Sequence, residues 1–291
     1  MSKHRNKLWY LVFVLPLFII FATVVLIPFV IGIFYSFFEW DGFSANPMVY
    51  VGLDNYIELI DDGRFVNSAW LTLEFTILSL VLVNVLGLGF ALLVTSAFKS
   101  ANFARTMFFM PNLIGGLILG YIWQFIFSDG FRIIGDLTGN EEVFRNWLTD
   151  RDLAMYALVI VFSWQMAGYM MIIYIAGIQS IPGEVMEAAE IDGANYWQRL
   201  KNIVMPLLMP ALTISLFLTL SFSFKIYDVN LSLTSGGPAN STELLAMHIY
   251  NEIFGYNNYG YGQAKAIIFF IVIAAITLVQ VYMTKKREVE M

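Results

Sequence analysis

Six runs of apolar residues, each long enough to cross a lipid bilayer, constrain this chain more than any other feature. They cover residues 8–38, 69–97, 105–127, 153–178, 206–228 and 263–284. A helix needs about 20 mostly apolar residues to span the hydrocarbon core, where it satisfies its own backbone hydrogen bonds. Charged residues make up only 13% of the 291 residues, against about 25% in a soluble domain. The sequence therefore predicts an all-α polytopic membrane protein with six transmembrane helices in one transmembrane domain, residues 1–291.

The first run follows the basic segment MSKHRNK. It is much longer than the apolar core of a signal peptide and lacks a small-x-small cleavage site, so we expect a retained span. It holds Pro16 and Pro28 and exceeds the length that one span needs. We therefore expect it to tilt, to kink, or to end as an interfacial stretch.

Lysine and arginine predict the orientation of the spans. Most of them fall on one side of the predicted membrane: Lys3, Arg5, Lys7, Lys99, Arg105, Arg199, Lys201, Lys285, Lys286 and Arg287. The other side carries four arginines diluted by Asp and Glu: Arg64, Arg132, Arg145 and Arg151. Because cytoplasmic loops carry the excess of Lys and Arg, both termini and the loop 179–205 are predicted to be cytoplasmic. The outer loops 39–68, 128–152 and 229–262 are too short for a separate domain.

Several kinds of chemistry are excluded or disfavoured. The net charge of -6 argues against a nucleic-acid partner, which calls for a basic face. The chain has no cysteine, which removes disulfides, Cys-ligated zinc and thiol nucleophiles. His4 and His248 lie far apart, so both are expected to be solvated and neither to bind a metal. No Gly-Lys pair occurs, so the chain has no P-loop and any ATP must bind to another polypeptide.

Ionisable residues within the runs are few: Glu74, Lys225 and Lys265, all near predicted outer ends. We expect all three to snorkel to the membrane interface; for Lys225 the alternative is a substrate-facing role, because polar residues surround it. Membrane enzymes and secondary transporters usually place ionisable clusters inside their spans. Their scarcity disfavours both classes.

The predicted cytoplasmic loop contains the polar stretch EAAEIDGANYWQRLKNIVMP, Glu187 to Pro206. Ser180 is expected to cap a helix start, Ala188 and Ala189 to offer a surface of close approach, and Gly193 to end the helix. A second short helix is indicated by apolar residues at helical spacing: Trp197, Leu200 and Val204. The pair is either an amphipathic helix on the bilayer surface or a docking element for a soluble partner. Its acidic border suits anionic lipids poorly.

The same stretch carries a resemblance to a known family. The pattern E-A-A-x3-G-x9-I-x-L-P is reproduced, with Met205 in place of Leu, by six residues: Glu187, Ala188, Ala189, Gly193, Ile203 and Pro206. It resembles the signature of permease subunits of binding-protein-dependent ABC importers. Further segments are similar to the carbohydrate-uptake branch, which includes maltose, multi-sugar and glycerol-phosphate importers: VGLDNYIEL, FFMPNLIGG, LTSGGPANST and YNNYGYGQA. The T-x-G-G-P loop of that branch is present at residues 234–238, with Ser235 where a third glycine is common.

The resemblance implies roles for three sets of residues. The loop 179–205 would be the coupling helix that contacts the ATPase, with the key residues Glu187, Ala188, Ala189, Asp192, Gly193, Ile203 and Pro206. The substrate path would be lined by polar and aromatic residues of the spans beside it: Gln165, Tyr169, Thr219, Ser223, Tyr227 and, more weakly, Asn112. Ordinary interhelical hydrogen bonding is the alternative for each. The outer loop Gly236, Gly237 and Pro238 would contact the binding protein or shape the gate; the alternative is a structural turn.

The resemblance also implies a function. The chain would be a non-catalytic permease subunit that imports a sugar or oligosaccharide, without a cofactor or metal of its own, because a partner ATPase binds ATP and Mg. Implied partners are a second permease subunit, two ATP-binding subunits and an extracytoplasmic binding protein, at a bacterial or archaeal cytoplasmic membrane. The alternatives are import of a polyol or glycerol phosphate and, from a different class, a self-sufficient secondary transporter.

Overall fold

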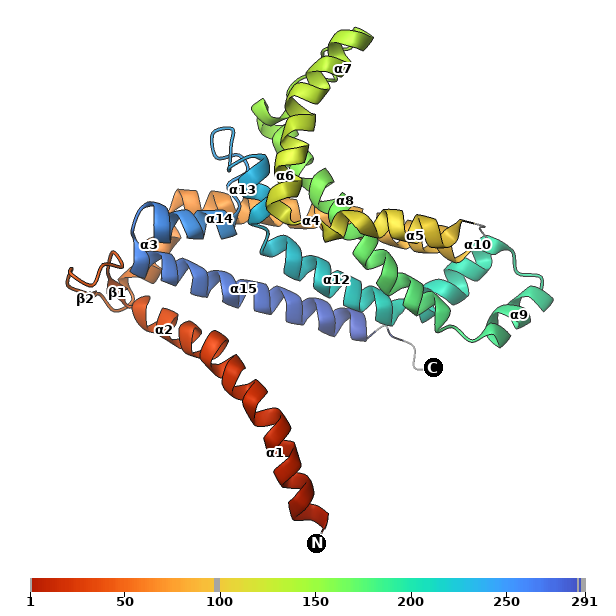
Figure 1. Cartoon of the computed structure of the whole chain (residues 1–291), viewed down its shortest axis with the longest axis horizontal. Coiled ribbons are helices and arrows are strands. Elements are labelled where there is room, and N and C mark those ends of the chain that lie inside the picture. Colours follow the sequence, from red (N-terminus) through yellow and green to blue (C-terminus); the bar gives the residue numbers. More distant parts are fainter. Residues whose placement is uncertain (1, 97–99, 287, 289–291) are drawn as a thin grey trace. The chain divides into compact units, whose positions relative to one another are not determined.

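The computed structural model describes residues 2–96, 100–286 and 288, and side chains from residue 12 onward. Lys99 and Arg287, and the side chains of Lys3, Arg5 and Lys7, which contribute to the predicted orientation, therefore lie outside the described residues. The described chain is mostly helical (Figure 1). It divides into two compact units, Met1–Phe65 with Ile249–Ile271 and Val66–His248 with Val272–Met291.

The first unit begins with one long helix that is built from three parts: α1 (Ser2–Phe21), a π-helical turn (Ala22–Leu26) and α2 (Ile27–Tyr35). The π turn comes just before Pro28, which lies at the start of α2. Proline has no N–H to donate, so the ladder is interrupted there. A two-stranded antiparallel ribbon follows, β1 (Phe38–Glu39) and β2 (Val49–Tyr50), and then α3 (Asp54–Asp61).

The remaining elements are helical. In chain order they are α4 (Gly63–Thr95), α5 (Ala101–Phe109), a 3-10 turn (Met110–Leu113), α6 (Gly116–Phe125), a π turn (Ile126–Gly130), α7 (Phe131–Thr138), a 3-10 turn (Trp147–Thr149), α8 (Arg151–Gln179), α9 (Gly183–Ile191), α10 (Tyr196–Arg199), a π turn (Leu200–Val204), α11 (Met205–Leu207), α12 (Met209–Phe224), α13 (Asp228–Leu233), α14 (Leu245–Tyr250), a π turn (Asn251–Gly255) and α15 (Tyr259–Lys285).

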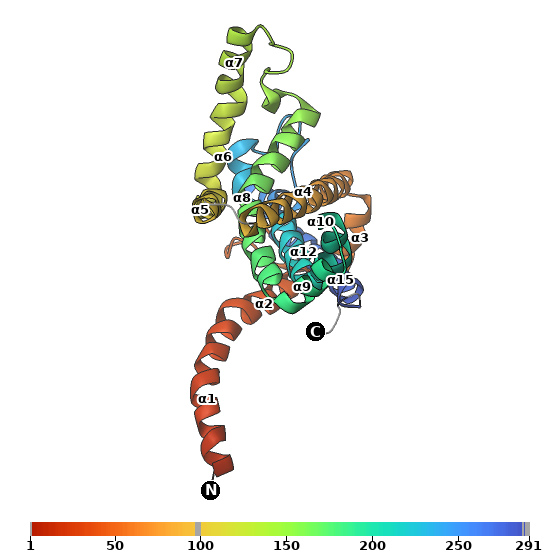
Figure 2. The same ribbon diagram turned by 90° about the vertical axis from the view of Figure 1, so that its right-hand side faces the viewer.

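Within the described residues, five helices are long and apolar enough to cross a membrane, or six if the bent pair Tyr196–Leu207 and Met209–Phe224 forms one span. The bend between that pair is 67°. The run 105–127 is divided: α5 ends before Pro111, Ile114 and Gly115 are extended, and the long apolar helix instead runs from Gly116 to Thr138 (Figure 2). Proline and the glycine pair end one helix and start the next, which the hydropathy of the run does not reveal.

The core of the second unit lies around α8, more than half of whose residues are buried. At two places, helices approach each other closely because one of them carries a glycine at the contact. A Cβ at Gly168 would overlap the carbonyl oxygen of Phe108 and lie 2.9 Å from the Cα of Phe109, both in α5. A Cβ at Gly120 of α6 would lie 2.9 Å from the Cβ of Ser232 in α13. Side chains at these positions would force backbones apart.

Gly168→Ala is therefore expected to destabilise the chain by about 2–3 kcal/mol, because the colliding atoms belong to backbone that cannot turn away. The thermal unfolding midpoint of the purified protein, followed by circular dichroism, measures the effect. Gly89→Ala is the matched control, because Gly89 lies in α4 and a Cβ added there would have nothing within 4 Å. It should be neutral or slightly stabilising; equal effects of the two changes would contradict the packing argument.

Candidate functional site

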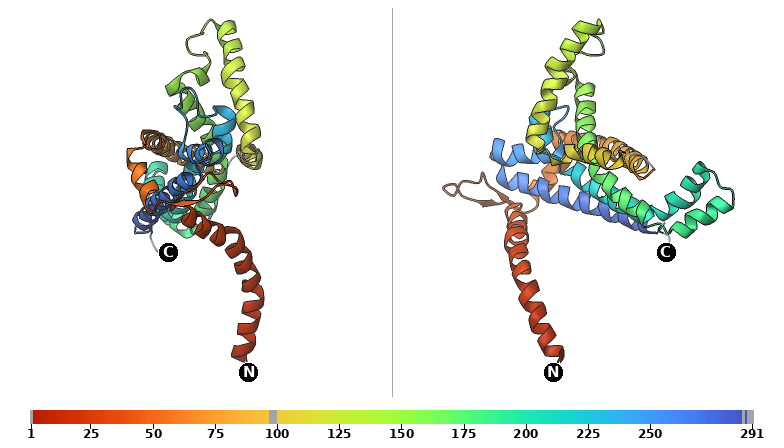
Figure 3. Two further views of the ribbon diagram at one scale, coloured as in Figure 1. Left: turned by 90° about the vertical axis from the view of Figure 1, so that its left-hand side faces the viewer. Right: turned by 45° about the vertical axis from the view of Figure 1, so that its right-hand side comes forward.

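The segment between α8 and α12 forms a helical hairpin that projects beyond both helices (Figure 3). We call α9 and α10, with the turn between them, the α9–α10 hairpin, residues 183–199. Gly193 has a φ of +76°, a backbone conformation that favours glycine. The Gly193 N–H donates to the Glu190 carbonyl at 3.1 Å and the Ala194 N–H to the Ala189 carbonyl at 3.0 Å. These two bonds form a Schellman motif, which fixes where α9 ends.

The second helix of the hairpin has a defined start as well. The Gln198 N–H donates to Asn195 Oδ1 at 3.0 Å, and the Asn195 N–H donates to Gln198 Oε1 at 2.8 Å, which makes a capping box. From Tyr196 the helix runs to Leu207 before the 67° bend into α12. The prediction that Ser180 caps the start of α9 is wrong. Its hydroxyl donates back to the Gly177 carbonyl, and the residue ends α8.

The predicted coupling residues divide by exposure. Glu187, Ala188, Asp192 and Gly193 are exposed, and Ile203 and Pro206 are half-buried. Ala189 is only 7% exposed and turns into the protein, so it supports α9 from within and does not offer a surface. Apolar side chains near them face outward, with Ile191 86% and Trp197 73% exposed. The hairpin thus combines ordered backbone with an exposed acidic and apolar surface.

The predicted substrate-path residues also differ in exposure. Three of them are buried and take part in packing. Gln165 is 7% exposed, and its amide donates to the Ile114 carbonyl at 3.0 Å. Thr219 and Ser223 are fully buried and donate to carbonyls of their own helix. In this structure, interhelical and intrahelical hydrogen bonding accounts for all three.

The other predicted path residues are more accessible. Tyr169 is half-buried, with its ring 6.4 Å from that of Phe222. Asn112 is half-buried and places its amide 3.9 Å from the Met166 sulfur. Tyr227 is half-buried just before α13, and Lys225 is exposed at the end of α12. These side chains are accessible for contact with a substrate.

A buried polar cluster that the sequence analysis missed connects three helices. Asn84 of α4 accepts hydrogen bonds at Oδ1 from Tyr174 of α8 and Ser215 of α12, both at 2.6 Å. Its amide donates to the Leu80 carbonyl at 2.7 Å and lies 3.5 Å from the Thr219 hydroxyl. An asparagine inside an apolar run is the signal that could have identified it, because an amide in a membrane needs partners.

The outer loop is ordered and largely packed. Gly236 is buried with a φ of +80°, and the Gly237–Pro238 peptide bond is cis. Thr242 donates from its hydroxyl to the Gly237 carbonyl at 2.7 Å and from its N–H to the Gly236 carbonyl at 3.1 Å. The amide of Asn230 donates to the Thr242 carbonyl at 2.8 Å. These bonds favour a structural turn, with Pro238 half-exposed at its tip.

Two expectations for ionisable residues are wrong. Lys265 does not snorkel: it is 1% exposed, and its Nζ lies 2.8 Å from Asp62 Oδ2 and 2.6 Å from Glu252 Oε2. His248 is not solvated: it is 1% exposed, with Nδ1 3.7 Å from Glu243 Oε1. The buried ammonium group of Lys265 requires opposite charge and hydrogen bonds beside it. Glu74 and Lys225 are exposed, as an interfacial location requires.

Comparison with known proteins identifies the chain's relatives. Residues 84–289 match the family described as "Binding-protein-dependent transport system inner membrane component". The chain is 50% identical, over 99% of its length and 97% of the relative, to the probable starch degradation products transport system permease protein AmyD of Thermoanaerobacterium thermosulfurigenes. It is 34% identical, over 99% of both chains, to the multiple sugar-binding transport system permease protein MsmF of Streptococcus mutans.

A solved structure has the same fold. A chain of the bacterial alginate ABC transporter in complex with an alginate pentasaccharide-bound periplasmic protein superposes with a TM-score of 0.78. The match covers 98% of this chain and 97% of the other at 20% sequence identity. At that identity the likeness shows the fold alone.

Proposed function

The chain belongs to the family of binding-protein-dependent transport system inner membrane components, and we propose that it is a permease subunit of an ATP-driven importer of sugars. The observation that carries this proposal is similarity over the whole chain to permeases of starch degradation products and multiple sugars. Its long apolar helices are those of a multi-pass membrane protein. It supplies one half of the transport path and catalyses no reaction itself.

The α9–α10 hairpin is proposed to be the coupling element. Motion of an ATPase is transmitted only by a packed element that moves as a body. The Schellman motif at Gly193 and the capping box at Asn195 fix the backbone of the hairpin. Exposed Glu187 and Ala188 then contact the ATPase, while the inward-facing Ala189 holds α9 in place.

The partners follow from this assignment. The path is completed by a second permease subunit, ATP and Mg are bound by two ATPase subunits, and an extracytoplasmic binding protein delivers the sugar. The proposed orientation, with both termini in the cytoplasm, is consistent with this role, because the α9–α10 hairpin is then on the same side as ATP. The proposed location is a bacterial or archaeal cytoplasmic membrane.

A sugar suits the accessible part of the predicted path. The apolar faces of sugar rings stack on aromatic side chains such as Tyr169, and their hydroxyls accept and donate hydrogen bonds. Tyr227 and Asn112 add such donors and acceptors. An oligosaccharide of the kind released from starch is therefore the proposed cargo, by analogy with the 50% identical relative.

Uptake by the reconstituted complex tests the proposal. The chain is placed in proteoliposomes with its partner permease, ATPase and binding protein, and entry of radiolabelled maltotriose is measured. We expect uptake that requires both ATP and the binding protein. Competition by unlabelled glycerol 3-phosphate, with none by maltose, would instead indicate a glycerol-phosphate importer. Uptake by the chain alone, driven by an ion gradient, would overturn the proposal in favour of a secondary transporter.

A further inference from the structure

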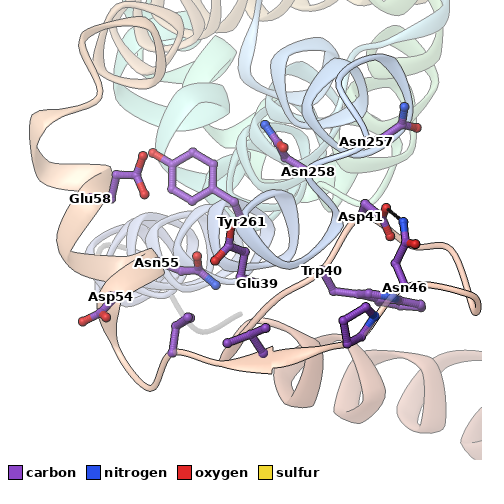
Figure 4. Close-up of a pocket in the computed structure, with 13 residues that line it drawn as sticks. Glu39, Trp40, Asp41, Asn46, Asp54, Asn55, Glu58, Asn257, Asn258 and Tyr261 are labelled. Carbon is purple, nitrogen blue, oxygen red and sulfur yellow. Dashed lines mark hydrogen bonds between the residues drawn. The ribbon is translucent and has the colours of Figure 1, made fainter.

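A polar cavity of about 610 Å³ lies within the first unit, between the β1–β2 ribbon, α3 and the start of α15 (Figure 4). Its lining includes Trp40 and Tyr261 and the amides of Asn46, Asn257 and Asn258. The cavity is large enough for a side chain presented by another molecule. The proposed orientation places it on the outer side of the membrane, since the loop 39–68 is an outer loop.

The charge of this cavity is entirely negative. Four carboxylates line it, those of Glu39, Asp41, Asp54 and Glu58, and its lining contains no Lys or Arg. Asp41 stays ionised, because hydrogen bonds from the Phe43 N–H and the Asn46 amide hold its pKa below the ordinary value. A concave site lined by one sign of charge concentrates the field and attracts the opposite charge.

The cavity also offers a hydrogen-bond acceptor on a residue that is otherwise packed. Asn55 is 7% exposed and lines the cavity. Its Nδ2 donates to the carbonyls of Ser36 at 2.9 Å and Phe38 at 3.1 Å. Within the described chain its Oδ1 has no hydrogen bond, and Figure 4 shows that oxygen turned toward Glu39 and Tyr261. An amide oxygen that is accessible from the cavity can accept a hydrogen bond from a ligand.

The walls that carry these groups are held by internal bonds. Tyr261 donates from its hydroxyl to Asp62 Oδ2 at 3.0 Å, and Asn258 donates to Glu252 Oε1 at 2.7 Å. Both carboxylates bind the buried Lys265. A preorganised site loses little conformational entropy when a ligand binds.

A metal ion is not the ligand that this arrangement fits. Calcium gathers six to eight oxygens around one point. Among the described residues, no group of three or more Asp, Glu or His is placed to hold a metal ion. The carboxylates are spread around a cavity of side-chain size, which fits an extended cation with several N–H donors. A guanidinium has five such donors, and an ammonium has three.

We propose that this cavity receives an arginine or lysine side chain of a protein partner that docks on the outer face, the extracytoplasmic binding protein. The cation lies near Glu39 and Glu58 and donates to Asn55 Oδ1, while Asp41, beside Asn46, adds negative charge elsewhere on the lining. Trp40 and Tyr261 supply aromatic surface for a guanidinium. The choice of partner rests on the proposed function and orientation, whereas the choice of a cationic group rests on the cavity alone.

Binding of a model peptide tests the site. The full chain is purified in nanodiscs and titrated with acetyl-Gly-Arg-Gly-amide, with acetyl-Gly-Gln-Gly-amide as the uncharged comparison, by isothermal titration calorimetry. The intact chain should bind the arginine peptide and leave the glutamine peptide unbound. The Glu39→Gln/Glu58→Gln double variant should bind it about tenfold more weakly. Neither carboxylate makes a hydrogen bond within the described residues, so the fold should be retained.

A matched control and a second measurement complete the test. Glu141→Gln/Glu142→Gln removes the same charge at exposed positions outside the cavity and should leave binding unchanged. For the intact chain, raising the salt from about 0.05 to about 0.5 M should weaken binding, which needs no variant. Equal binding of both peptides, or equal affinity in the double variant and the intact chain, would overturn the inference. Maltotriose uptake is measured separately, so that failure of this inference can be told apart from failure of the proposed function.

Discussion

Replacement of Lys265 by methionine is expected to lower the free energy of unfolding by about 3–5 kcal/mol. Lys265 is buried, and its ammonium group bonds to Asp62 and Glu252 at 2.8 and 2.6 Å. The ring of Tyr261 lies 4.3 Å from Nζ and adds a cation–π contact. Methionine preserves the length of the side chain but removes the ammonium group that lies between the two carboxylates. The unfolding midpoint in denaturant, followed by intrinsic fluorescence, measures the loss.

The control for this change lies at the other end of the same helix. Lys285→Met makes the same chemical change at an exposed position of α15 and should alter stability by less than about 0.5 kcal/mol. Adding Asp62→Asn and Glu252→Gln to Lys265→Met removes all three charges and should restore part of the loss. If the single Lys265 variant is as stable as the Lys285 variant, the buried cluster does not support the fold.

The same cluster predicts how stability depends on pH. Burial acts to raise the pKa of Asp62, but the hydrogen bond and charge of Lys265, together with hydrogen bonds from the Phe65 N–H and Tyr261, lower it to about 2 from 3.8. A carboxyl whose pKa is lower in the folded state stabilises the fold fully above its unfolded value. That contribution is therefore present above pH 3.8 and is lost as the pH falls toward 2. Asp62→Asn should flatten stability against pH in that window.

Hydropathy predicted most of the helices and failed where the backbone breaks. The runs 69–97, 153–178 and 263–284 correspond to α4, α8 and α15, because long apolar stretches in lipid have few alternatives to a helix. The run 105–127 is equally apolar but contains Pro111 and Gly115, and its helix starts at Gly116. The helix boundaries in this run are therefore set by its proline and glycine residues, which an average of hydropathy over the run does not register.

Polar side chains inside apolar runs were harder to predict. Thr219 is predicted to line the substrate path, and the structure adds that its hydroxyl bonds within α12, near Asn84. Lys265 was expected at the interface because it lies near the predicted outer end of its span. Its partner Asp62 lies 203 residues earlier along the chain and was not foreseen. Sequence shows that a buried polar group needs a partner, but only the fold shows which residue provides it. By contrast, the turn at Gly193 was predictable, because its chemistry is local.

Glu187→Arg is expected to reduce ATP-dependent uptake at least tenfold while leaving the fold intact. Glu187 is exposed on α9, so reversing its charge costs the isolated chain less than about 0.5 kcal/mol. At a contact with an ATPase, the same change places a like charge or an unpaired charge at the interface. Such a change typically costs about 2 kcal/mol or more of binding free energy, which is roughly thirtyfold in affinity. Maltotriose uptake and co-purification of the ATPase are the measurements. Glu142→Arg, exposed and remote, should match the intact chain in both.

Substitutions at Gly193 separate the geometry of the hairpin from its surface chemistry. The residue has a φ of +76° with nothing within 4 Å of an added Cβ, so only backbone conformation limits what it tolerates. Asparagine adopts left-handed conformations readily, whereas β-branched valine resists them by about 1–2 kcal/mol or more. Gly193→Asn should therefore retain most uptake, and Gly193→Val should lose it, because the angle between α9 and α10 changes. Equal uptake by the two variants would mean that the angle of the hairpin is irrelevant to coupling.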